Sequence, residues 1–376
     1  MENSQLVIGV DAGGTKTEAW LARVLNTQQA EGVLTSLAKQ VQVLGHGTAG
    51  SGNLRAVGFQ TATENMWLAI VAAYASAKRA VVPAAAICMG VAGAGRAQEQ
   101  DQLEQWCRTA ELARHARVTG DALPVLAAAY ADRPLHELAQ MSGIALICGT
   151  GSMAWGCIPT KDPVPASDRA AAIALEADSR VSVAREARAG GWGYLLGDEG
   201  SGYWLAMQGL RAACRSVDGR GPATRLLPAL LARLKLTDPT QLIGAIYGET
   251  FDRRRIASLA EVVVELAEDS DQAADSQALE IIDLAAAELC QLVLAVDGQL
   301  SFGAAPLTLA ATGGVLLGSP ALRQRLQQQL LHHGRTADVV LVENPVQGAV
   351  YLAANWAKES VARGTMWPPK STKNAE

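Results

Sequence analysis

Short apolar runs alternate along the chain with longer segments of helical spacing. The runs predicted to be strands are Leu6–Val10, Thr17–Val24, Ala86–Val91, Ile144–Cys148, Met153–Ile158, Leu307–Ala311 and Val339–Val342. The predicted helices are Asn53–Arg79, a segment from Ile256 to Leu266, Ser276–Val296, a segment that follows Ser319 and Pro320, and Pro345–Ala357. Strands that alternate with helices predict an α/β fold, in which helices cover a sheet.

Two pairs of predicted strands are joined by links too short to contain a crossover helix. The first two strands are separated only by Asp11–Lys16, and the strand ending at Cys148 is separated from the next only by Gly149–Ser152. Each pair is therefore predicted to be an antiparallel hairpin. One glycine-rich hairpin in each half of the chain predicts a duplicated architecture of two lobes with a cleft between them.

Two stretches depart from this alternation. The segment Pro159–Arg188 is polar and charged, and we interpret it as an insertion or a mobile excursion. The pattern is lost after Trp356, which predicts a flexible tail over residues 359–376.

Composition and charge narrow the class of protein. At roughly 150 residues per domain, a chain of 376 residues predicts two or three domains, and 49% hydrophobic with 18% charged residues is the composition of a folded protein. The net charge of −5 provides no basic field for nucleic acid or for an anionic membrane. Apolar stretches such as Pro83–Ala94 are too short to span a bilayer, and the N-terminus lacks the basic segment of a signal peptide. We therefore expect a cytoplasmic protein without a nucleic-acid or membrane partner.

Cysteine and histidine spacing argues against disulfide, zinc and serine-hydrolase chemistry. The cysteines, at positions 88, 107, 148, 157, 214 and 290, include no C-x-x-C pair. The histidines lack a metal-binding spacing, and no G-x-S-x-G sequence is present.

The first hairpin link has the residues of a turn that binds phosphate and metal. Gly13 and Gly14 allow backbone N–H groups to approach an anion, and Thr15 and Lys16 add hydroxyl and ammonium donors. Asp11, at the end of a buried strand, is placed to hold Mg²⁺ through its water ligands. The alternative is a tight turn in which the glycines serve geometry alone. The link is not a Walker A loop, because a strand follows it where a helix should begin.

Two glycine turns in the second half offer similar chemistry. Gly149 and Gly151 open the backbone of the second hairpin, while Thr150 and Ser152 provide hydroxyls for phosphate oxygens. The pair Gly313-Gly314 stands between a buried strand and a helix, where an adenine ring can lie against the backbone. An ordinary strand-to-helix turn is the alternative for that pair.

Two carboxylate positions allow a structural and a functional interpretation. Asp121 follows a short strand and begins an apolar helix, so it is either an N-cap or a base for an acceptor hydroxyl. Asp198 and Glu199 precede another helix and could cap it. The glycines around Trp192 instead suit a polyol, with the indole as an apolar wall, although Trp192 could equally be a core residue.

Taken in order, these segments resemble the actin/hexokinase/Hsp70-type ATPase superfamily. Within it, the chain is similar to the N-acetylglucosamine kinase and BadF/BadG-type ATPase family from Leu6 to about Ala357, most specifically through GGWGYLLGDEGSGYW at residues 190–204. The resemblance implies an actin-like ATPase fold of two RNase H-like lobes, with ATP and a sugar in the cleft. It implies an N-terminal lobe over residues 1–119, to which a helix over residues 345–358 returns, and a C-terminal lobe over residues 120–344. It also implies a homodimer.

The resemblance implies a role for each matching residue. Asp121 would be catalytic, and Asp11 would lie near Mg²⁺. ATP would contact Gly13, Gly14, Thr15, Lys16, Gly149, Thr150, Gly151, Gly313 and Gly314. The sugar would contact Asn53, Asp121, Ser152, Gly191, Trp192 and Asp198. Met153 and Ala189 replace an asparagine and a cysteine of the mammalian-type enzyme, both at the sugar end.

The implied reaction transfers the γ-phosphoryl group of ATP to the 6-hydroxyl of N-acetylglucosamine, with Mg²⁺ and the hairpins neutralising charge. Glucosamine and N-acetylmuramic acid are alternative acceptors. One alternative of another class is a BadF-type activator ATPase, which would need cysteine ligands for an iron–sulfur cluster that the spacing here does not supply. Another is a sugar-binding regulator without catalysis, against which the presence of Asp11 and Asp121 argues.

Overall fold

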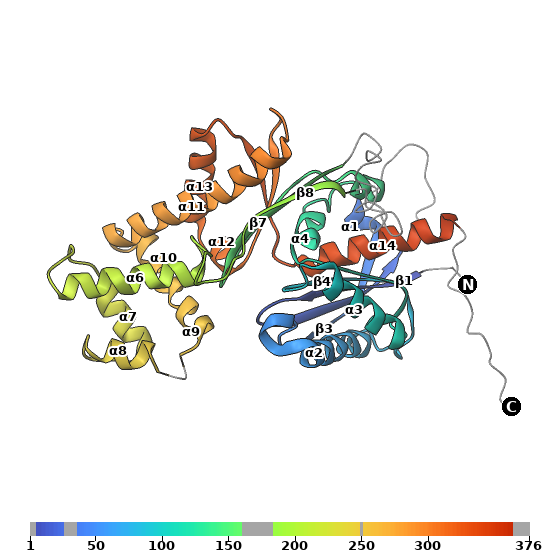
Figure 1. The fold of residues 1–376 in the computed structure, drawn as a ribbon, viewed down its shortest axis with the longest axis horizontal. Helices are drawn as coiled ribbons and strands as arrows, with labels where there is room; N and C mark the ends of the chain where they lie inside the picture. The colour runs from blue at the N-terminus through green and yellow to red at the C-terminus, as the bar shows by residue number, and fades with distance from the viewer. Residues whose placement is uncertain (1–4, 26–35, 160–182, 249–250, 364–376) are drawn as a thin grey trace. The chain divides into compact units, whose positions relative to one another are not determined.

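The computed structural model describes residues 5–25, 36–159, 183–248 and 251–363, which form two compact units (Figure 1). Of the described residues, the first unit contains those up to Met141 and those from Asn344 onward, and the second contains those from Ser142 to Glu343. The boundary therefore lies later in the chain than the expected one after residue 119.

The first unit is built on a five-stranded sheet in the order β3-β2-β1-β4-β5. Its strands are β1 (Gln5–Ala12), β2 (Thr17–Val24), β3 (Val41–Ala49), β4 (Ala84–Val91) and β5 (Ala113–Thr119). Strands β1, β2 and β3 are antiparallel neighbours, whereas β1, β4 and β5 run parallel. Its helices are α1 (Leu37–Gln40), α2 (Leu54–Ser76), α3 (Ala97–Thr109), α4 (Ala122–Ala128) and α14 (Pro345–Arg363), with the 3₁₀ helix η1 (Leu135–Gln140).

Both faces of this sheet are covered by helices, with α14 and α4 on one side and α2 and α3 on the other (Figure 1). The continuous apolar run of β1 is the pattern of a strand buried on both faces, and Val7, Ile8 and Val10 are almost fully buried. Gly9 lets α14 approach the sheet, since a Cβ atom there would lie 2.5 Å from the backbone nitrogen of Val350. Because α4 packs against α14 and β4, the segment after residue 119 belongs to the first unit.

The second unit repeats this plan with a five-stranded sheet in the order β10-β9-β6-β7-β8. Its strands are β6 (Gly143–Cys148), β7 (Ser152–Pro159), β8 (Val183–Gly190), β9 (Leu307–Thr312) and β10 (Ala337–Leu341). Strands β6, β7 and β8 are antiparallel neighbours, and β6, β9 and β10 run parallel. Read outward from β6, this is the order of the first sheet outward from β1, so the predicted duplication and the two predicted hairpins are confirmed.

The helices of the second unit are α6 (Gly202–Val217), α7 (Leu226–Leu234), α8 (Gln241–Ile246), α9 (Arg253–Ser258), α10 (Ala260–Ala267), α11 (Ser276–Leu300), α12 (Gly314–Gly318) and α13 (Pro320–His332). Ser319 caps α13 as predicted, with its side chain accepting from the backbone N–H of Leu322. The apolar core contains side chains of α6, α10, α11 and the sheet.

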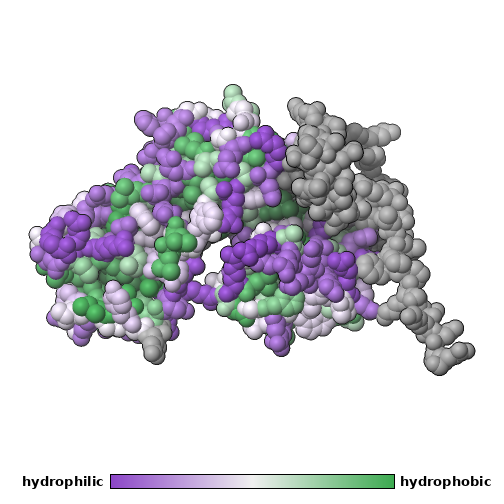
Figure 2. Space-filling view, in the orientation of Figure 1, coloured by the Kyte–Doolittle hydropathy of each residue, from purple (hydrophilic) through white to green (hydrophobic). Residues whose placement is uncertain are grey.

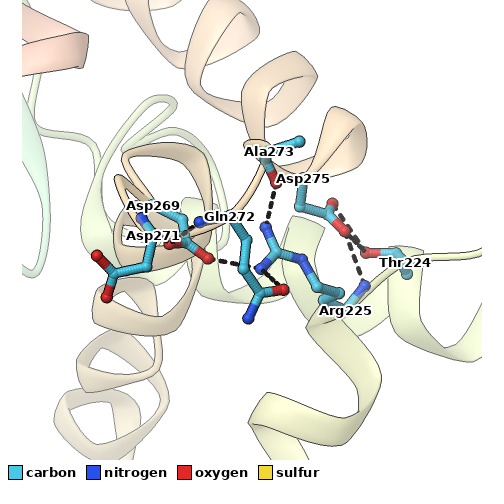
Figure 3. Close-up of polar contacts among 7 residues, drawn as sticks. All are labelled: Thr224, Arg225, Asp269, Asp271, Gln272, Ala273 and Asp275. Atoms are coloured by element: carbon cyan, nitrogen blue, oxygen red, sulfur yellow. Dashed lines mark hydrogen bonds and ion pairs between the residues drawn. The ribbon is translucent and has the colours of Figure 1, made fainter.

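A polar network fixes the start of α11 to the start of α7 (Figure 3). Asp275 caps α11 by accepting from the N–H groups of Gln277 and Ala278, and it also accepts from the N–H of Arg225 at 2.7 Å and from Thr224 Oγ1 at 3.0 Å. Burial would raise the pKa of Asp275, but the combined hydrogen bonds outweigh it and lower the pKa. The guanidinium of Arg225 in turn bonds to Asp269, Gln272 and the carbonyl of Ala273.

All the predicted strands are present, and the differences from the sequence prediction lie elsewhere. Residues 160–182 of the predicted insertion lie outside the described residues, but Val183–Gly190 forms β8, so that prediction is wrong for this part. The helix predicted from Ile256 to Leu266 is interrupted at Leu259 between α9 and α10. Helix α14 continues to Arg363, so the predicted tail is wrong for residues 359–363, and residues 364–376 lie outside the described residues.

Within the described part of the chain, no helix has both the length and the apolar character needed to cross a bilayer. The six cysteines are free, and Cys214 is exposed while the other five are buried.

Candidate active site

Two acidic side chains lie at the edge of the first sheet where its parallel strands end. Asp11 is near the end of β1, Asp121 follows the end of β5, and β4 lies between these strands. Parallel strands present their carboxyl ends at one edge, where open α/β sheets bind ligands. Burial raises the pKa of Asp11 to about 7, and the nearby charges of Asp121 and Glu18 add to this effect, while Lys16 opposes it. The two carboxylates therefore interact electrostatically.

Asp121 does not act as a helix cap. It occupies the N-cap position of α4, but with φ of −64° and ψ of −20° its backbone is already helical, and its side chain makes no capping hydrogen bond. The capping interpretation of Asp121 is therefore wrong. Thr119 Oγ1 bonds to the carbonyl of Gly120 at 2.9 Å, which orders the turn just before Asp121.

The first hairpin places unpaired backbone donors beside Asp11. The N–H of Gly13 donates to the carbonyl of Lys16 at 3.0 Å and closes the turn. The N–H groups of Gly14 and Thr15 donate to no described residue, so they are available to an anion. Lys16 is exposed and its ammonium pairs with Glu18 at 2.7 Å.

Asn53 lies next to this hairpin as the N-cap of α2. Its Oδ1 accepts from the N–H groups of Arg55 and Ala56 at 2.9 and 3.2 Å. The N–H of Gly52 donates to the carbonyl of Gly13 at 3.1 Å, which holds this segment against the hairpin. A Cβ atom at Gly14 would lie 3.9 Å from Nδ2 of Asn53, so the amide nitrogen is on the hairpin side.

The acidic pair fits a hydrated Mg²⁺ ion. This cation is usually held in proteins by one or two carboxylates together with water and substrate phosphates. A cation would also stabilise the charged form of Asp11, which burial and the repulsion by Asp121 disfavour. No cluster of three or more His, Cys, Asp or Glu side chains suited to a metal occurs among the described residues, so the protein atoms there do not form a closed cage.

The second hairpin has the same local form in the second unit. The N–H of Gly149 donates to the carbonyl of Gly151 at 2.9 Å, and the N–H of Gly202 at the start of α6 donates to the carbonyl of Gly149 at 2.8 Å. The N–H groups of Thr150 and Gly151 have no acceptor among the described residues. Like the first hairpin, the second therefore offers backbone donors to an anion.

The Gly313-Gly314 turn lies directly beside this second hairpin. Gly313 has a φ of 99°, and a Cβ atom there would lie 2.3 Å from the carbonyl oxygen of Cys148. A Cβ atom at Gly149 would lie 3.9 Å from the Cα of Gly313. The structure thus brings together the predicted phosphate hairpin and the predicted adenosine turn within one unit.

Asp198 is buried and held from several directions. Its Oδ2 accepts from Arg253 Nη2 at 2.6 Å, and its Oδ1 accepts from the N–H of Ser152 at 3.4 Å. Burial raises the pKa of Asp198, although Arg253 and the N–H groups of Ser152 and Gly193 act in the opposite direction. The cap of α6 is Ser201, so the capping interpretation of Asp198 is wrong.

Trp192 lies on the surface of the second unit with 70% of its area exposed, so the core interpretation of this residue is wrong. The guanidinium of Arg188 lies 5.7 Å from the centre of its ring and also donates to the carbonyl of Gly191 at 3.1 Å. Leu195 and Leu196 in the same loop are exposed as well. The loop offers an apolar surface at which the C–H face of a sugar could pack.

The sequence matches the model of the BadF/BadG/BcrA/BcrD ATPase family over residues 8–161 and 179–353. The chain belongs to this family. The match covers both hairpins, Asp121, the loop around Trp192 and the Gly313-Gly314 turn.

Two curated relatives of this BadF/BadG/BcrA/BcrD-family chain are sugar kinases. The chain is 28% identical over 348 residues to an N-acetylmuramic acid/N-acetylglucosamine kinase of Clostridium acetobutylicum, covering 92% of this chain and 97% of the relative. It is 26% identical over 369 residues to an N-acetyl-D-glucosamine kinase of Dictyostelium discoideum, covering 95% and 100% of the two chains.

Solved structures share the fold of this family member. A structural-genomics target from Chromobacterium violaceum superposes with a TM-score of 0.64 at 22% identity, covering 93% of this chain and 99% of the other. A ROK family glucokinase from Streptomyces griseus, solved with glucose and AMPPNP, superposes with a TM-score of 0.55 at 15% identity over 93% and 99% of the chains. The predicted two-lobe α/β fold of the actin-like ATPase type is confirmed.

The predicted sugar contacts of this family member belong to different units. Asn53 and Asp121 lie in the first unit, whereas the contacts predicted after residue 142, which are Ser152, Gly191, Trp192 and Asp198, lie in the second. Sequence reasoning missed Arg253, the partner of Asp198. The two residues are 55 positions apart in the sequence. Arg253 is one of three consecutive arginines, and nothing in the sequence distinguishes it from the other two.

Proposed function

We propose that this chain is an ATP-dependent amino-sugar kinase that transfers the γ-phosphoryl group of ATP to the 6-hydroxyl of N-acetylglucosamine. Both curated relatives are kinases of N-acetylated amino sugars, and each is matched over more than nine-tenths of its length. Two hairpins with unpaired backbone donors, one in each unit, suit the phosphates of the nucleotide.

The observation that carries this proposal is the position of the Asp121 carboxylate and its interaction with Asp11. The carboxylate makes no capping hydrogen bond to α4 and interacts with Asp11, at the sheet edge where ligands bind in α/β folds. A carboxylate at this place is suited to align an acceptor hydroxyl and to take its proton. In phosphoryl transfer, such positioning and the neutralisation of charge are the main tasks of the protein.

The remaining residues divide into nucleotide, metal and sugar roles. The hairpin residues Gly13, Gly14, Thr15, Lys16, Gly149, Thr150 and Gly151 would receive the phosphates, and Gly313 with Gly314 the adenosine. Asp11 would hold Mg²⁺, which when bound neutralises charge on the phosphates. Asn53, Ser152, Gly191, Trp192 and Asp198 would contact the sugar. Met153 and Ala189, which differ from the mammalian-type residues, would tune the preference for the acyl group.

The assembly and location follow as further parts of the proposal. A cytoplasmic location supplies the ATP that the reaction consumes. The family resemblance implies a homodimer, and a groove of about 850 Å³ in the second unit is bordered by the exposed Ile243, Tyr247 and Leu284. Hydrophobic residues interrupt the hydrophilic surface in the region of α7 and α8 (Figure 2). Such patches are typical of contact surfaces.

The test is release of ADP measured against a panel of acylated and free amino sugars. N-acetylglucosamine is expected to give the highest kcat/KM, and its product should carry phosphate on the 6-oxygen. A preference for glucosamine or N-acetylmuramic acid would correct the acceptor but keep the class of enzyme. ADP release that no sugar stimulates would overturn the assignment as a kinase.

A further inference from the structure

The second hairpin is flanked by a side chain to which the proposed function gives no role. Arg253 is the first residue of α9, and its backbone is ordered by the capping residue Asp252, which accepts from the N–H of Arg255 at 2.9 Å. Its Nη2 donates to Asp198, whose side chain is only 4% exposed. Asp198 in turn accepts from the N–H of Ser152, the first residue after the hairpin. The guanidinium is thus linked through one carboxylate to the end of the hairpin.

The ion pair also packs directly on the hairpin backbone. A Cβ atom at Gly151 would lie 2.8 Å from Arg253 Nη2 and 2.8 Å from Asp198 Oδ2. A side chain at this position would therefore have to displace the ion pair or the hairpin.

Two tyrosines connect Arg253 to Thr150 of the hairpin. The guanidinium carbon of Arg253 lies 5.2 Å from the centre of the Tyr194 ring, a distance typical of a cation–π contact. Tyr194 packs edge-on against Tyr203 with ring centres 5.0 Å apart. The N–H of Tyr203 lies 3.4 Å from the carbonyl of Thr150, to which it donates. Arg253 therefore joins contacts on both sides of Gly151.

One buried hydrogen-bond donor of Arg253, its Nε, has no acceptor among the described residues. The guanidinium of Arg225 in the same unit instead bonds to three acceptors (Figure 3). The guanidinium of Arg253 is therefore held mainly by Asp198 and Tyr194, so its position depends on these two residues.

We propose that Arg253 is a positioning residue for nucleotide binding, which together with Asp198 clamps the Gly149–Gly151 hairpin in the conformation that receives the phosphates. The identity of the ligand, a nucleoside polyphosphate, rests on the proposed kinase function. The clamp itself rests on the contacts of Arg253 with Asp198, Gly151 and Tyr194.

The experiment compares Arg253→Ala with Arg254→Ala, an exposed neighbour on the same helix that has no hydrogen bond or ion pair to the described residues. Binding of AMPPNP with Mg²⁺ and binding of N-acetylglucosamine are measured separately by calorimetry. Hydrogen exchange of the hairpin amides is measured in the free protein.

Arg253→Ala should raise the Kd for AMPPNP by about 10-fold or more, the scale of losing a charged hydrogen bond. The hydrogen-bonded amides at the hairpin, those of Gly149, Ser152 and Tyr203, should exchange faster by a similar factor. The Kd for the sugar should rise by a smaller factor, because Asp198, a proposed sugar contact, loses its partner but stays in place. Arg254→Ala should change none of these quantities by more than about twofold.

A second variant keeps the proposal testable if Arg253→Ala does not fold. Gly151→Ala leaves every charge in place and inserts a methyl group between the ion pair and the hairpin, so it should also weaken AMPPNP binding and speed exchange. Arg253→Lys keeps the charge without the planar group and should restore only part of the affinity.

Nucleotide affinity and exchange within twofold of the wild type in both Arg253→Ala and Gly151→Ala would overturn the proposal, and so would a wild-type protein that binds no nucleotide. A wild type that binds AMPPNP but phosphorylates no sugar would contradict the kinase function and leave the clamp to be decided by the binding data.

Discussion

The two glycine hairpins occupy equivalent places in the two sheets but have different charged groups beside them. The first follows β1 and lies at the edge that holds Asp11 and Asp121, where burial and then the charge of Asp121 raise the pKa of Asp11 to about 7. The second follows β6 and is packed by the ion pair of Arg253 and Asp198. Both leave two backbone N–H groups without an acceptor among the described residues.

This difference indicates a division of tasks within a duplicated fold. The backbone of each hairpin supplies donors for an anion, and the neighbouring side chains decide what else the hairpin region can do. Of two interacting carboxylates, one can hold a cation and the other can accept a proton. An ion pair that packs on the hairpin favours a fixed backbone. We infer that the side chains beside the first hairpin supply the groups for chemistry and that those beside the second fix the hairpin backbone, and the predictions below test this division.

The largest effect is expected for Asp121→Asn, which removes the proposed base and leaves the shape of the residue. Turnover should fall by about 10²-fold or more. The melting temperature should not fall through the loss of a helix cap, because Asp121 makes no capping bond to α4. The measurement is kcat with N-acetylglucosamine, with Asp132→Asn, an exposed aspartate soon after α4, as the control for the loss of charge. Wild-type turnover in Asp121→Asn would show that the first hairpin region lacks the chemical role assigned to it.

The duplication behind this comparison could be predicted from local sequence alone. The links Asp11–Lys16 and Gly149–Ser152 are too short for a crossover helix, so they dictate antiparallel hairpins. Strand β3 was not predicted because Gly45 and Gly47 interrupt its apolar pattern. Those glycines pack against α2, where Cβ atoms would lie 2.2 Å and 2.0 Å from the carbonyls of Ala73 and Ala69. Strand β8 was missed because its charged residues resemble a loop.

The candidate site could be predicted only where its residues are close together in the sequence. The hairpin glycines and the Gly313-Gly314 turn stand next to apolar runs and were found. The partnership of Asp198 with Arg253 depends on how α9 packs against α6, which no local pattern encodes. The exposure of Trp192 likewise follows from the loop conformation, since a tryptophan between glycines fits a core as well as a surface.

The next largest effect is expected for Gly313→Ala, which tests whether the second hairpin depends on close packing. With a φ of 99° and the Cys148 carbonyl 2.3 Å from a Cβ atom, alanine is strained and obstructed. The free energy of unfolding should fall by about 2–3 kcal/mol, measured by urea denaturation. Gly318→Ala is the matched control, because a Cβ atom there meets no atom within 4 Å. Equal stability of the two variants would contradict tight packing at this turn.

A smaller effect is expected for Trp192→Ala, which tests the sugar role of the second unit. Because the side chain is 70% exposed, its loss should change the unfolding free energy by less than about 0.5 kcal/mol. If the indole packs against the sugar, KM for N-acetylglucosamine should rise by about 10-fold while KM for ATP changes little. Trp67→Ala, at a partly exposed tryptophan of α2 that is 38% exposed, serves as the control. An unchanged KM for the sugar would remove Trp192 from the proposed binding surface.

The smallest effect is expected for Asp11→Asn in the metal-free protein, and it depends on pH. Because the folded-state pKa of about 7 lies above the unfolded value near 3.9, the folded protein retains a proton that the unfolded chain releases between these values. Stability from this group is therefore full at low pH and is lost as the pH rises to about 7. The asparagine variant lacks this loss, so relative to the wild type it should gain on the order of 1 kcal/mol, or about 3 °C in Tm, between pH 6 and pH 7. Thermal unfolding in EDTA measures the difference, with Asp101→Asn on the exposed surface of α3 as control. A Tm difference that does not vary with pH would mean that folding does not raise the pKa of Asp11. The contrast between the two hairpins would then rest on Arg253 and Asp198 alone.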